Sequence, residues 1–496
     1  MKTKNNDLSP KIAIQSLLRP ELTKVCSNKD YEEFKSTIGS IDKIIRESRI
    51  EKEIVAAVLK KHEGLKLSVK QLSKQALISI KAFRTETLRF LLGQPSFREL
   101  SIEISKSDLL ADFCLALSLN GITGVSKSSL DRNSKLFTEL ELYTIHQNLT
   151  KELIGNEIGL LPHSLEVESQ FVDSTCIEAN IHHPTDWVCL KDFCFSVLNS
   201  IEVIRKYNIL NRLPKEIKEF KRELNQLCIG MAHARRSKDS SRKRKQIFRE
   251  LKKLTTQIGK HGKKHLEKLK QEWTNTKLSL KQREYIQERL SSLLELESHI
   301  VSQAHERIIG GRLVKNESKI LSIYDLEIEV LKRGKAGKDV EFGNKFYISE
   351  NADGYILDYS LSTGNPDDRA LLEESLNRLQ AAGLGTPKSI CADRGFYGIR
   401  FSNKLKQRGI IDNSCPKGVN KLQEKLKEPE FVKQQKRRAG TEARIGILKA
   451  KFSLNSLNSK GFTNRSRSCA WAVLTHNLWM LCKQILAVQR SKKEAA

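Results

Sequence analysis

Apolar residues recur at helical spacing along most of residues 1–160, for example over the stretch 41–59. A capping box, in which Ser96 is followed three positions later by Glu99, predicts the start of a further helix. These patterns predict a helical N-terminal region.

Within this region a helical stretch at 108–119 is followed by a glycine-containing turn at 120–124 and a short helix from Ser126. That last helix carries Lys127, Arg132 and Lys135. The order is typical of a helix-turn-helix DNA reader, whose last helix places side chains in a groove. A plain helical bundle fits the same pattern equally well.

The pattern changes near residue 165. Residues 169–181 alternate and are rich in β-branched side chains, which predicts a strand, and 187–309 returns to long helices. From residue 319 the chain predicts a hairpin (339–349 with 355–361), a helix (368–382), a strand (389–393), a helix (400–408), a strand (410–414) and a helix (433–452). This is an α/β order with a mixed sheet, and the helical block looks like an insertion after its first strand.

We therefore expect four parts. They are a helical N-terminal region (1–160), the first part of an α/β core (161–186), a basic helical insertion (187–318) and the remainder of the core with a C-terminal helix (319–496). A length of 496 residues agrees with more than one structural unit.

The charge is the strongest signal in the composition. The chain has 87 Lys and Arg against 59 Asp and Glu, which gives a net charge of +28. Residues 231–270 alone contain fifteen Lys or Arg and three acidic residues, a net charge of +12. Such a run is usually a solvated helix face, but its density favours contact with the phosphates of a nucleic acid.

The ten cysteines form no CxxC pair, so we expect scattered core thiols and no zinc ribbon. The N-terminus lacks the apolar run of a signal peptide, which favours a cytoplasmic protein. Residues 469–488 are nearly long enough to span a membrane, but His476, Asn477 and Lys483 lie inside this stretch. We predict a buried C-terminal helix there.

Three carboxylates stand out by position. Asp173 interrupts an apolar strand, Asp393 closes another, and Glu442 lies on a helix crowded with cations. A carboxylate at a buried strand end is costly unless it is bound, and Mg²⁺ prefers such oxygen ligands. Each residue alone is more often a turn or cap residue. As a set, they could hold two metal ions for a phosphoryl displacement.

The helix around Glu442 adds an independent argument. Arg438, Glu442, Gly446 and Lys449 are spaced to share one helical face, and the glycine would let a DNA strand approach it. A solvated face of ion pairs would show the same spacing.

Taken together, four segments resemble successive blocks of DDE insertion-sequence transposases, specifically the ISNCY-type group. They are Phe171-Val-Asp-Ser-Thr-Cys-Ile-Glu-Ala-Asn-Ile-His-His-Pro-Thr-Asp186, Lys335-Ala-Gly-Lys-Asp-Val-Glu-Phe-Gly343, Cys391-Ala-Asp-Arg-Gly-Phe-Tyr-Gly398 and Arg438-Ala-Gly-Thr-Glu-Ala-Arg-Ile-Gly-Ile-Leu-Lys449. The resemblance runs from about residue 80 to the C-terminus.

The resemblance implies an RNase H-like core in which Asp173, Asp393 and Glu442 bind two Mg²⁺ ions, with Mn²⁺ as a substitute. It implies cleavage and joining of double-stranded DNA at the terminal inverted repeats of an insertion sequence, by a homodimer in a prokaryotic nucleoid. Arg438, Glu442 and Lys449 also fit the Arg-x3-Glu-x6-Lys signature of a broader transposase set. The tyrosine that begins that signature is Gln435 here.

Other cations are candidates for DNA phosphate contacts. Arg394 and Lys417 follow predicted strand ends, and a role as plain surface charges is about equally expected. The densest run of the insertion is Arg242, Lys243, Arg244 and Lys245. Phe396 and Tyr397 could stack on a displaced base, although aromatic residues after a strand are more often part of the core.

Two other functions share much of this pattern. A structure-specific nuclease would use the same core without joining DNA. A DNA-binding protein derived from a transposase would lack catalysis, but its mark would be a lost carboxylate, and all three are present.

Overall fold

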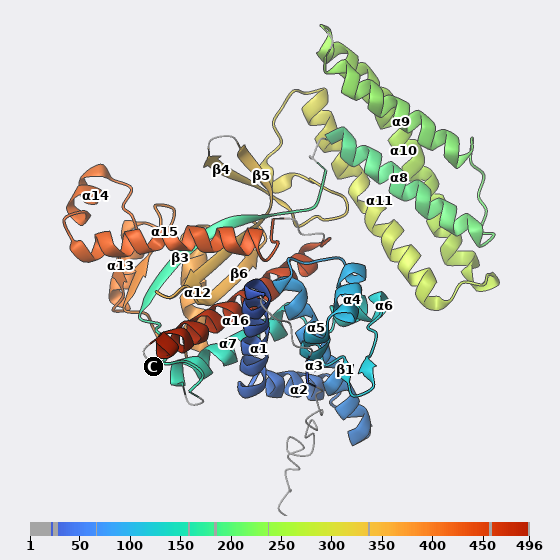
Figure 1. Cartoon of the computed structure of the whole chain (residues 1–496). Helices are drawn as coiled ribbons and strands as arrows, with labels where there is room; N and C mark the ends of the chain where they lie inside the picture. Colours follow the sequence, from blue (N-terminus) through green and yellow to red (C-terminus); the bar gives the residue numbers. More distant parts are fainter. Residues whose placement is uncertain are drawn as a thin grey trace, which may run out of the picture. The chain divides into compact units, whose positions relative to one another are not determined.

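The computed structural model describes residues 21–22, 28–65, 67–156, 159–182, 186–236, 238–335, 338–455 and 459–494 (Figure 1). The chain divides into two compact units, each with a hydrophobic core of its own. The first unit consists of Met1–Glu178, Asn344–Ser459 and Thr463–Ala496. The second consists of Ala179–Gly343 and Lys460–Phe462.

The N-terminal part of the first unit is mainly helical. Its elements are α1 (Lys29–Glu47), α2 (Ile50–Lys61), α3 (Val69–Leu91), α4 (Phe97–Lys106), α5 (Asp108–Phe113), a hairpin of β1 (Leu117–Ser118) and β2 (Gly121–Ile122), α6 (Lys127–Asn133) and α7 (Glu139–Gly155). The predicted capping box is present at the start of α4, where the Ser96 hydroxyl accepts from the Glu99 N–H.

The periodic stretch 41–59 is helical but divided between α1 and α2, because the chain breaks at Ser48 and the Arg49 N–H donates to the Glu152 carboxylate of α7 at 2.9 Å. Two other expectations for this part are corrected. The helix expected at 108–119 ends at Phe113, since Leu115 adopts a left-handed conformation with φ 54°. A hairpin then replaces the expected turn, so the region is not all-helical.

The sheet is mixed, as the sequence predicts. Its strands are β3 (Ser169–Glu178), β4 (Glu329–Lys335), β5 (Lys338–Glu350), β6 (Ile356–Ser362), β7 (Ser389–Cys391) and β8 (Ile411–Asp412). Their order is β4-β5-β3-β7-β8, and β6 also pairs with β5. β5 is antiparallel to β4 and β6, whereas β7 is parallel to β3 and β8. The sequence did not predict β4.

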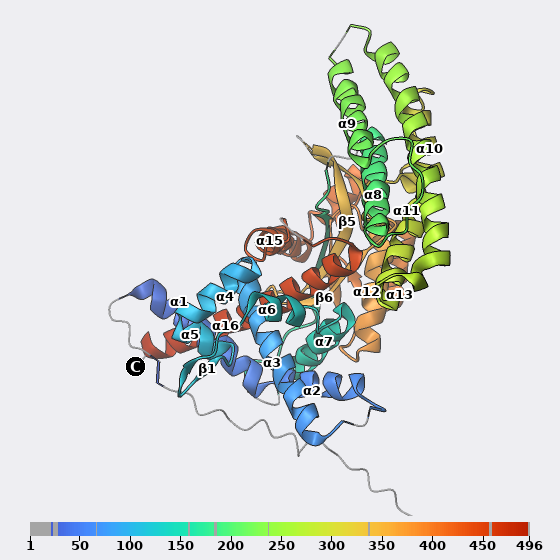
Figure 2. The same cartoon turned by 90° about the vertical axis from the view of Figure 1, so that its right-hand side faces the viewer.

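Helices from the C-terminal part of the chain accompany these strands (Figures 1 and 2). They are α12 (Asp368–Ala381), α13 (Ile399–Gln407), α14 (Val419–Lys425), α15 (Pro429–Ala450) and α16 (Phe462–Glu494). α12 packs against β6, and α15 packs against β3 and β7. α15 is the helix that carries Glu442.

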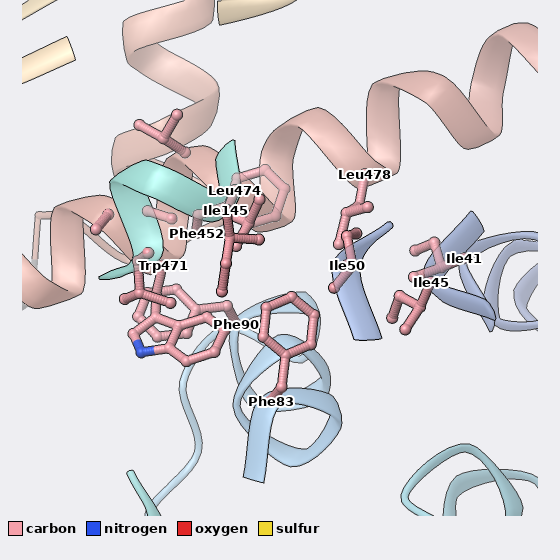
Figure 3. Packing of buried hydrophobic residues seen from close by; sticks show 14 of the residues in the cluster. Ile41, Ile45, Ile50, Phe83, Phe90, Ile145, Phe452, Trp471, Leu474 and Leu478 are labelled. Carbon is pink, nitrogen blue, oxygen red and sulfur yellow. The ribbon is translucent and has the colours of Figure 1, made fainter. Parts of the chain in front are cut away.

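The largest core of the first unit joins the N-terminal helices to α16. Figure 3 shows Trp471 and Leu474 among Phe83, Phe90 and other apolar side chains, and the ring centroids of Trp471 and Phe83 lie 5.3 Å apart. Burial of each such side chain contributes roughly 1.5–3 kcal/mol. The predicted buried C-terminal helix is confirmed, since Asn477 is fully buried and bonds both backbone groups of Ile356.

The second unit is built mainly from long helices around their own core. They are α8 (Asp186–Lys206), α9 (Ile217–Ala234), α10 (Ser240–Glu272) and α11 (Leu280–Ile308), with short 3-10 turns η1 (Trp273–Asn275) and η2 (Asn316–Ser318). α8, α10 and α11 pack closely together. Gly262 of α10 makes this approach possible, because a Cβ there would lie 2.8 Å from Val197 of α8.

Two further expectations from composition can be compared with the fold. The cysteines within the described residues are free thiols, and all are buried except the half-buried Cys415. Burial raises the pKa of the Cys194 thiol to about 12, as expected for a core thiol. None of the described helices is long and apolar enough to cross a membrane.

Candidate active site

The register of the sheet brings two of the three carboxylates together. In the parallel pair β3 and β7, Phe171 lies opposite Cys391. Asp173 and Asp393 each follow two residues later, so the two adjacent strands bring them to the same edge. The two carboxylates are close enough for Asp393 to raise the pKa of Asp173.

Asp173 is the electrostatic centre of the site. Its pKa is raised to about 6, chiefly by burial and also by the nearby Asp393 and Glu442 carboxylates. Two contacts act in the opposite sense: the Ser174 N–H, which donates to the carboxylate at 2.7 Å, and the Arg438 guanidinium. Asp173, Asp393, Glu442 and Arg438 therefore act on one another electrostatically, as one cluster drawn from β3, the end of β7 and α15.

α15 brings its pair of charged residues to this cluster. Arg438 donates from both terminal nitrogens to Oε1 of Glu442 at 3.3 Å, one helical turn away. Glu442 is 63% exposed, whereas Arg438 is 17% exposed. A Cβ at Gly446 would meet nothing within 4 Å, so this part of the helix face is open to another molecule. Lys449 is half-buried one turn further on.

Gln435, which stands where the broader signature has tyrosine, ties α15 to the sheet. Its side-chain amide donates to the carbonyl oxygens of Ala392 at 3.2 Å and Asn413 at 2.7 Å, at the ends of β7 and β8. Its oxygen accepts from Nε of Arg438 at 3.3 Å. Gln435 thus holds Arg438 and anchors the helix near Asp393.

A fourth carboxylate, Asp368, lies beside the loop that carries Asp393. It accepts a hydrogen bond from the Ser174 hydroxyl at 2.8 Å and pairs with Lys345 at 3.3 Å. A Cβ on Gly395 would lie 3.0 Å from an oxygen of Asp368 and 3.0 Å from one of Asp393. No sequence pattern indicated this residue, because Asp368 stands at the start of α12, where an acid is an ordinary helix-start residue.

The donor set of the cluster suits a hard divalent cation. Three carboxylates provide oxygen ligands. A bound cation would offset the cost of burying the charge of Asp173 and the repulsion from its acidic neighbours, the two effects that raise its pKa. In the part of the chain described here, no three acidic, His or Cys side chains are already drawn together tightly enough to hold one ion. Glu442 is instead paired with Arg438.

The remaining candidates differ in their surroundings. Arg394 and Lys417 are exposed, next to the ends of β7 and β8. Phe396 is buried against Tyr347, with ring centroids 6.2 Å apart, so it is a core residue and not a base-stacking one.

The basic run at the start of α10 belongs to the second unit. Arg242 and Lys243 are exposed, and Arg244 and Lys245 are half-buried. Exposed cations continue along one face of the helix, since Arg242, Arg249, Lys253, Lys260 and Lys264 are spaced by seven, four, seven and four residues. We call these five residues the α10 stripe. It extends over about 33 Å at 1.5 Å per residue.

Comparison with known proteins supports one family. A family model described as a transposase DDE domain matches residues 334–478, a range that contains Asp393, Glu442 and Arg438 but not Asp173. No curated protein and no solved structure matches the chain. The match supports a DDE transposase family and, with it, an enzyme that acts on DNA.

Proposed function

We propose that this protein is a DDE transposase of the ISNCY-type group, which cleaves DNA at the terminal inverted repeats of an insertion sequence and joins the freed ends to target DNA. The observation that carries the proposal is the convergence of Asp173, Asp393 and Glu442 on one cluster with Arg438. The core around this cluster would be RNase H-like, with its first carboxylate on the central strand β3.

Asp173, Asp393 and Glu442 would hold two Mg²⁺ ions. Bound there, the ions would activate a water or a 3′-hydroxyl and stabilise the departing oxygen of an in-line phosphoryl displacement. Asp173 would give up the proton that its raised pKa favours, and Glu442 would turn from Arg438 toward the ions. Arg438 would then be available to a DNA phosphate.

Other cations would position the DNA. Lys449 is on α15, and Arg394 and Lys417 follow the ends of β7 and β8, so they could contact phosphates near the reacting one. The α10 stripe would bind the backbone of flanking or target DNA, since its length is close to one turn of the duplex, about 34 Å. Joining two element ends would require a homodimer.

Recognition of the inverted repeats falls to the N-terminal region in this proposal. The segment that the sequence suggested as a helix-turn-helix contains α5, the hairpin of β1 and β2, and α6. Lys127 and Arg132 of α6 are exposed, whereas Lys135 is paired with Asp131 at 3.2 Å. α6 is therefore the segment that could present side chains to a groove.

Strand transfer with a labelled terminal-repeat duplex tests the proposal. The repeat is identified as an inverted sequence flanking the gene and bounded by a short duplication. We expect wild type to produce joined products in Mg²⁺ and Asp393→Ala to lose at least about 100-fold in rate, because a metal ligand is removed. Glu424→Ala, which removes an exposed carboxylate of α14, is the matched control and should retain full activity.

The products separate this proposal from its rivals. Hydrolysed but unjoined ends would indicate a nuclease, and binding without cleavage would indicate a non-catalytic DNA-binding protein. Joined products formed by Asp393→Ala at the wild-type rate would show that the proposed carboxylates are wrong.

A further inference from the structure

A buried carboxylate outside the proposed triad is bound by three side chains of α15. Glu350, the last residue of β5, is 0% exposed. Its Oε1 accepts from Arg437 at 3.0 Å and from the Thr441 hydroxyl at 2.8 Å, and its Oε2 accepts from Nε of Arg444 at 3.0 Å. We call Glu350, Arg437, Thr441 and Arg444 the Glu350 cluster.

The two arginines also fix the chain on either side of Glu350. Arg437 donates to the carbonyl oxygens of Asn351 at 2.8 Å and Ala352 at 2.6 Å in the turn after β5. Arg444 lies against Gly354, where a Cβ would be 1.8 Å from its guanidinium, and Gly354 has φ 87°. The turn between β5 and β6 and the face of α15 are thus fitted to each other.

The position of these contacts determines where Glu442 points. Successive residues of a helix are about 100° apart, so Arg437, Thr441 and Arg444 share one face. Arg438 and Glu442 each follow a member of the cluster by one residue and lie on the neighbouring face. A change in the rotation of α15 would therefore move Glu442 away from Asp173.

A contact with β3 sets the position of α15 along its axis as well. The Arg437 guanidinium lies 4.7 Å from the ring centroid of Phe171. Phe171 stands two residues before Asp173, and side chains two apart along a strand point to the same face. Two consecutive residues of α15 therefore lie beside two residues of β3 that share a face: Arg437 contacts Phe171, and Arg438 lies near Asp173.

We infer that Glu350 is a positioning residue for the proposed metal site: through Arg437, Thr441 and Arg444 it holds α15 at the rotation that presents Glu442 to Asp173 and Asp393. Glu350 does not touch the reacting atoms. The inference rests on the proposed function. The inference extends the proposed function by adding a residue of β5 on which the affinity for the divalent cation depends.

Binding of Mn²⁺, followed by the loss of its EPR signal in the whole metal-free protein, tests the inference without relying on catalysis. We expect Glu350→Gln to weaken Mn²⁺ binding by about tenfold or more, the range seen when a partner that orients metal ligands is removed. Thr441→Val removes one of the three side-chain partners of Glu350 and leaves both arginines in place, so we expect a smaller loss of about threefold in the same assay. Thr441→Val keeps the test decisive if Glu350→Gln folds poorly.

Asp358→Asn is the matched control. Asp358 is another fully buried carboxylate of the same sheet, on β6, and it is bound by Arg378 at 2.6 Å and Tyr143 at 2.7 Å. We expect this variant to lower thermal stability while its Mn²⁺ affinity stays within about twofold of wild type, because Arg378 lies on α12 and not on α15.

The outcomes distinguish the two proposals. If wild type binds Mn²⁺, and Glu350→Gln and Thr441→Val bind it equally well, the positioning role is wrong and the proposed function stands. The positioning role is also wrong if Asp358→Asn weakens Mn²⁺ binding as much as Glu350→Gln does. If wild type fails to bind Mn²⁺, or if Asp393→Ala binds it as tightly as wild type does, the proposed function itself fails, and the inference fails with it.

Discussion

Asp173 carries a charge that the metal-free protein accommodates poorly. Its pKa is raised to about 6 by burial and by its acidic neighbours, so folding favours the protonated form. The stabilisation of the folded state that comes from protonating Asp173 is fully present below the usual aspartate pKa of about 4. It is lost as the pH rises through 6. At neutral pH the charged side chain therefore destabilises the fold, a cost that a bound cation would offset.

We accordingly expect Asp173→Asn to stabilise the metal-free protein at pH 7.5 by about 1–3 kcal/mol and to have little effect near pH 4. The asparagine oxygen can still accept the Ser174 N–H. Urea unfolding at the two pH values measures the difference, with Asp412→Asn at the end of β8 as control. Mn²⁺ should stabilise wild type and not Asp173→Asn, and a variant no more stable than wild type at pH 7.5 would contradict this account.

Gln435 shows how a departure from a family signature is used locally. Its amide nitrogen donates to the carbonyl oxygens of two strand ends, and its oxygen accepts from Arg438. A tyrosine hydroxyl has one O–H and could not replace both of these donated bonds. We expect Gln435→Ala to destabilise the protein by about 1–3 kcal/mol, because these backbone groups lose a buried partner.

The same variant should lower the rate of strand transfer more than it lowers DNA binding, since α15 would lose its anchor beside Asp393. Thermal unfolding and the strand-transfer assay provide the measurements. Lys436→Ala, an exposed neighbour on the same helix, is the control. Unchanged stability in Gln435→Ala would show that the two carbonyls find other partners.

At the scale of elements, strong periodicity predicted helices and strands well. The long helices of the insertion, the hairpin of β5 and β6, and α15 are all present close to their predicted bounds. The face of α15 with Arg438 and Glu442 was also predicted, because their ion pair depends only on helical spacing. The face that binds Glu350 was not, since its partner lies on a strand far away in the sequence.

Short elements were predicted less well. The hairpin of β1 and β2 and the break between α1 and α2 depend on single backbone conformations and on one contact from α7. Such contacts exist only once the chain has folded, so local pattern cannot reveal them. Asp368 was missed for the same reason, because its role comes from contacts with β3 and with the loop after β7.

The charge of α10 leads to a prediction about salt dependence. Neutralising Arg249, Lys253, Lys260 and Lys264 to Gln removes four of the five cations of the α10 stripe. If each contacts a phosphate, the slope of log K against log salt should fall by about 3–4, and binding should weaken on every DNA sequence. Binding to a labelled duplex between low and moderate salt measures this slope.

Neutralising four exposed lysines of α2 and α3 serves as the control for that experiment. These are Lys52, Lys60, Lys70 and Lys74. The control should change the slope by less than about 1, because general charge has only a long-range, screened effect. Equal slopes for the two variants would mean that the α10 stripe is only a solvated helix face.

At the scale of the whole molecule, the net charge and the carboxylate cluster belong to different units. The cluster, the Glu350 cluster and most of the sheet lie in the first unit, and the α10 stripe lies in the second. Each unit has its own buried core. A variant of the α10 stripe can therefore be tested for DNA binding without disturbing the packing that positions Glu442.

The first unit also contains two fully buried histidines, His146 of α7 and His476 of α16. Burial lowers their pKa values to about 4 and about 3, so both remain neutral in the folded protein. In the unfolded chain they take up protons below about pH 6.5, and stability falls as the pH decreases from 6.5 toward 4. Each contributes a loss of about 2 kcal/mol between neutral pH and pH 5. The protonation of Asp173 offsets about 1 kcal/mol of this, so the histidines dominate.

We therefore expect the double variant His146→Gln and His476→Gln to be less stable than wild type at pH 7.5, because His146 loses its fitted contact with the Ile356 carbonyl. The variant should nevertheless lose about 4 kcal/mol less stability than wild type between pH 7.5 and pH 5, since glutamine takes up no proton. Urea unfolding of both proteins at several pH values measures the two slopes. Parallel pH profiles would show that the acid sensitivity arises from other groups, because removing both histidines would then leave the proton uptake on unfolding unchanged.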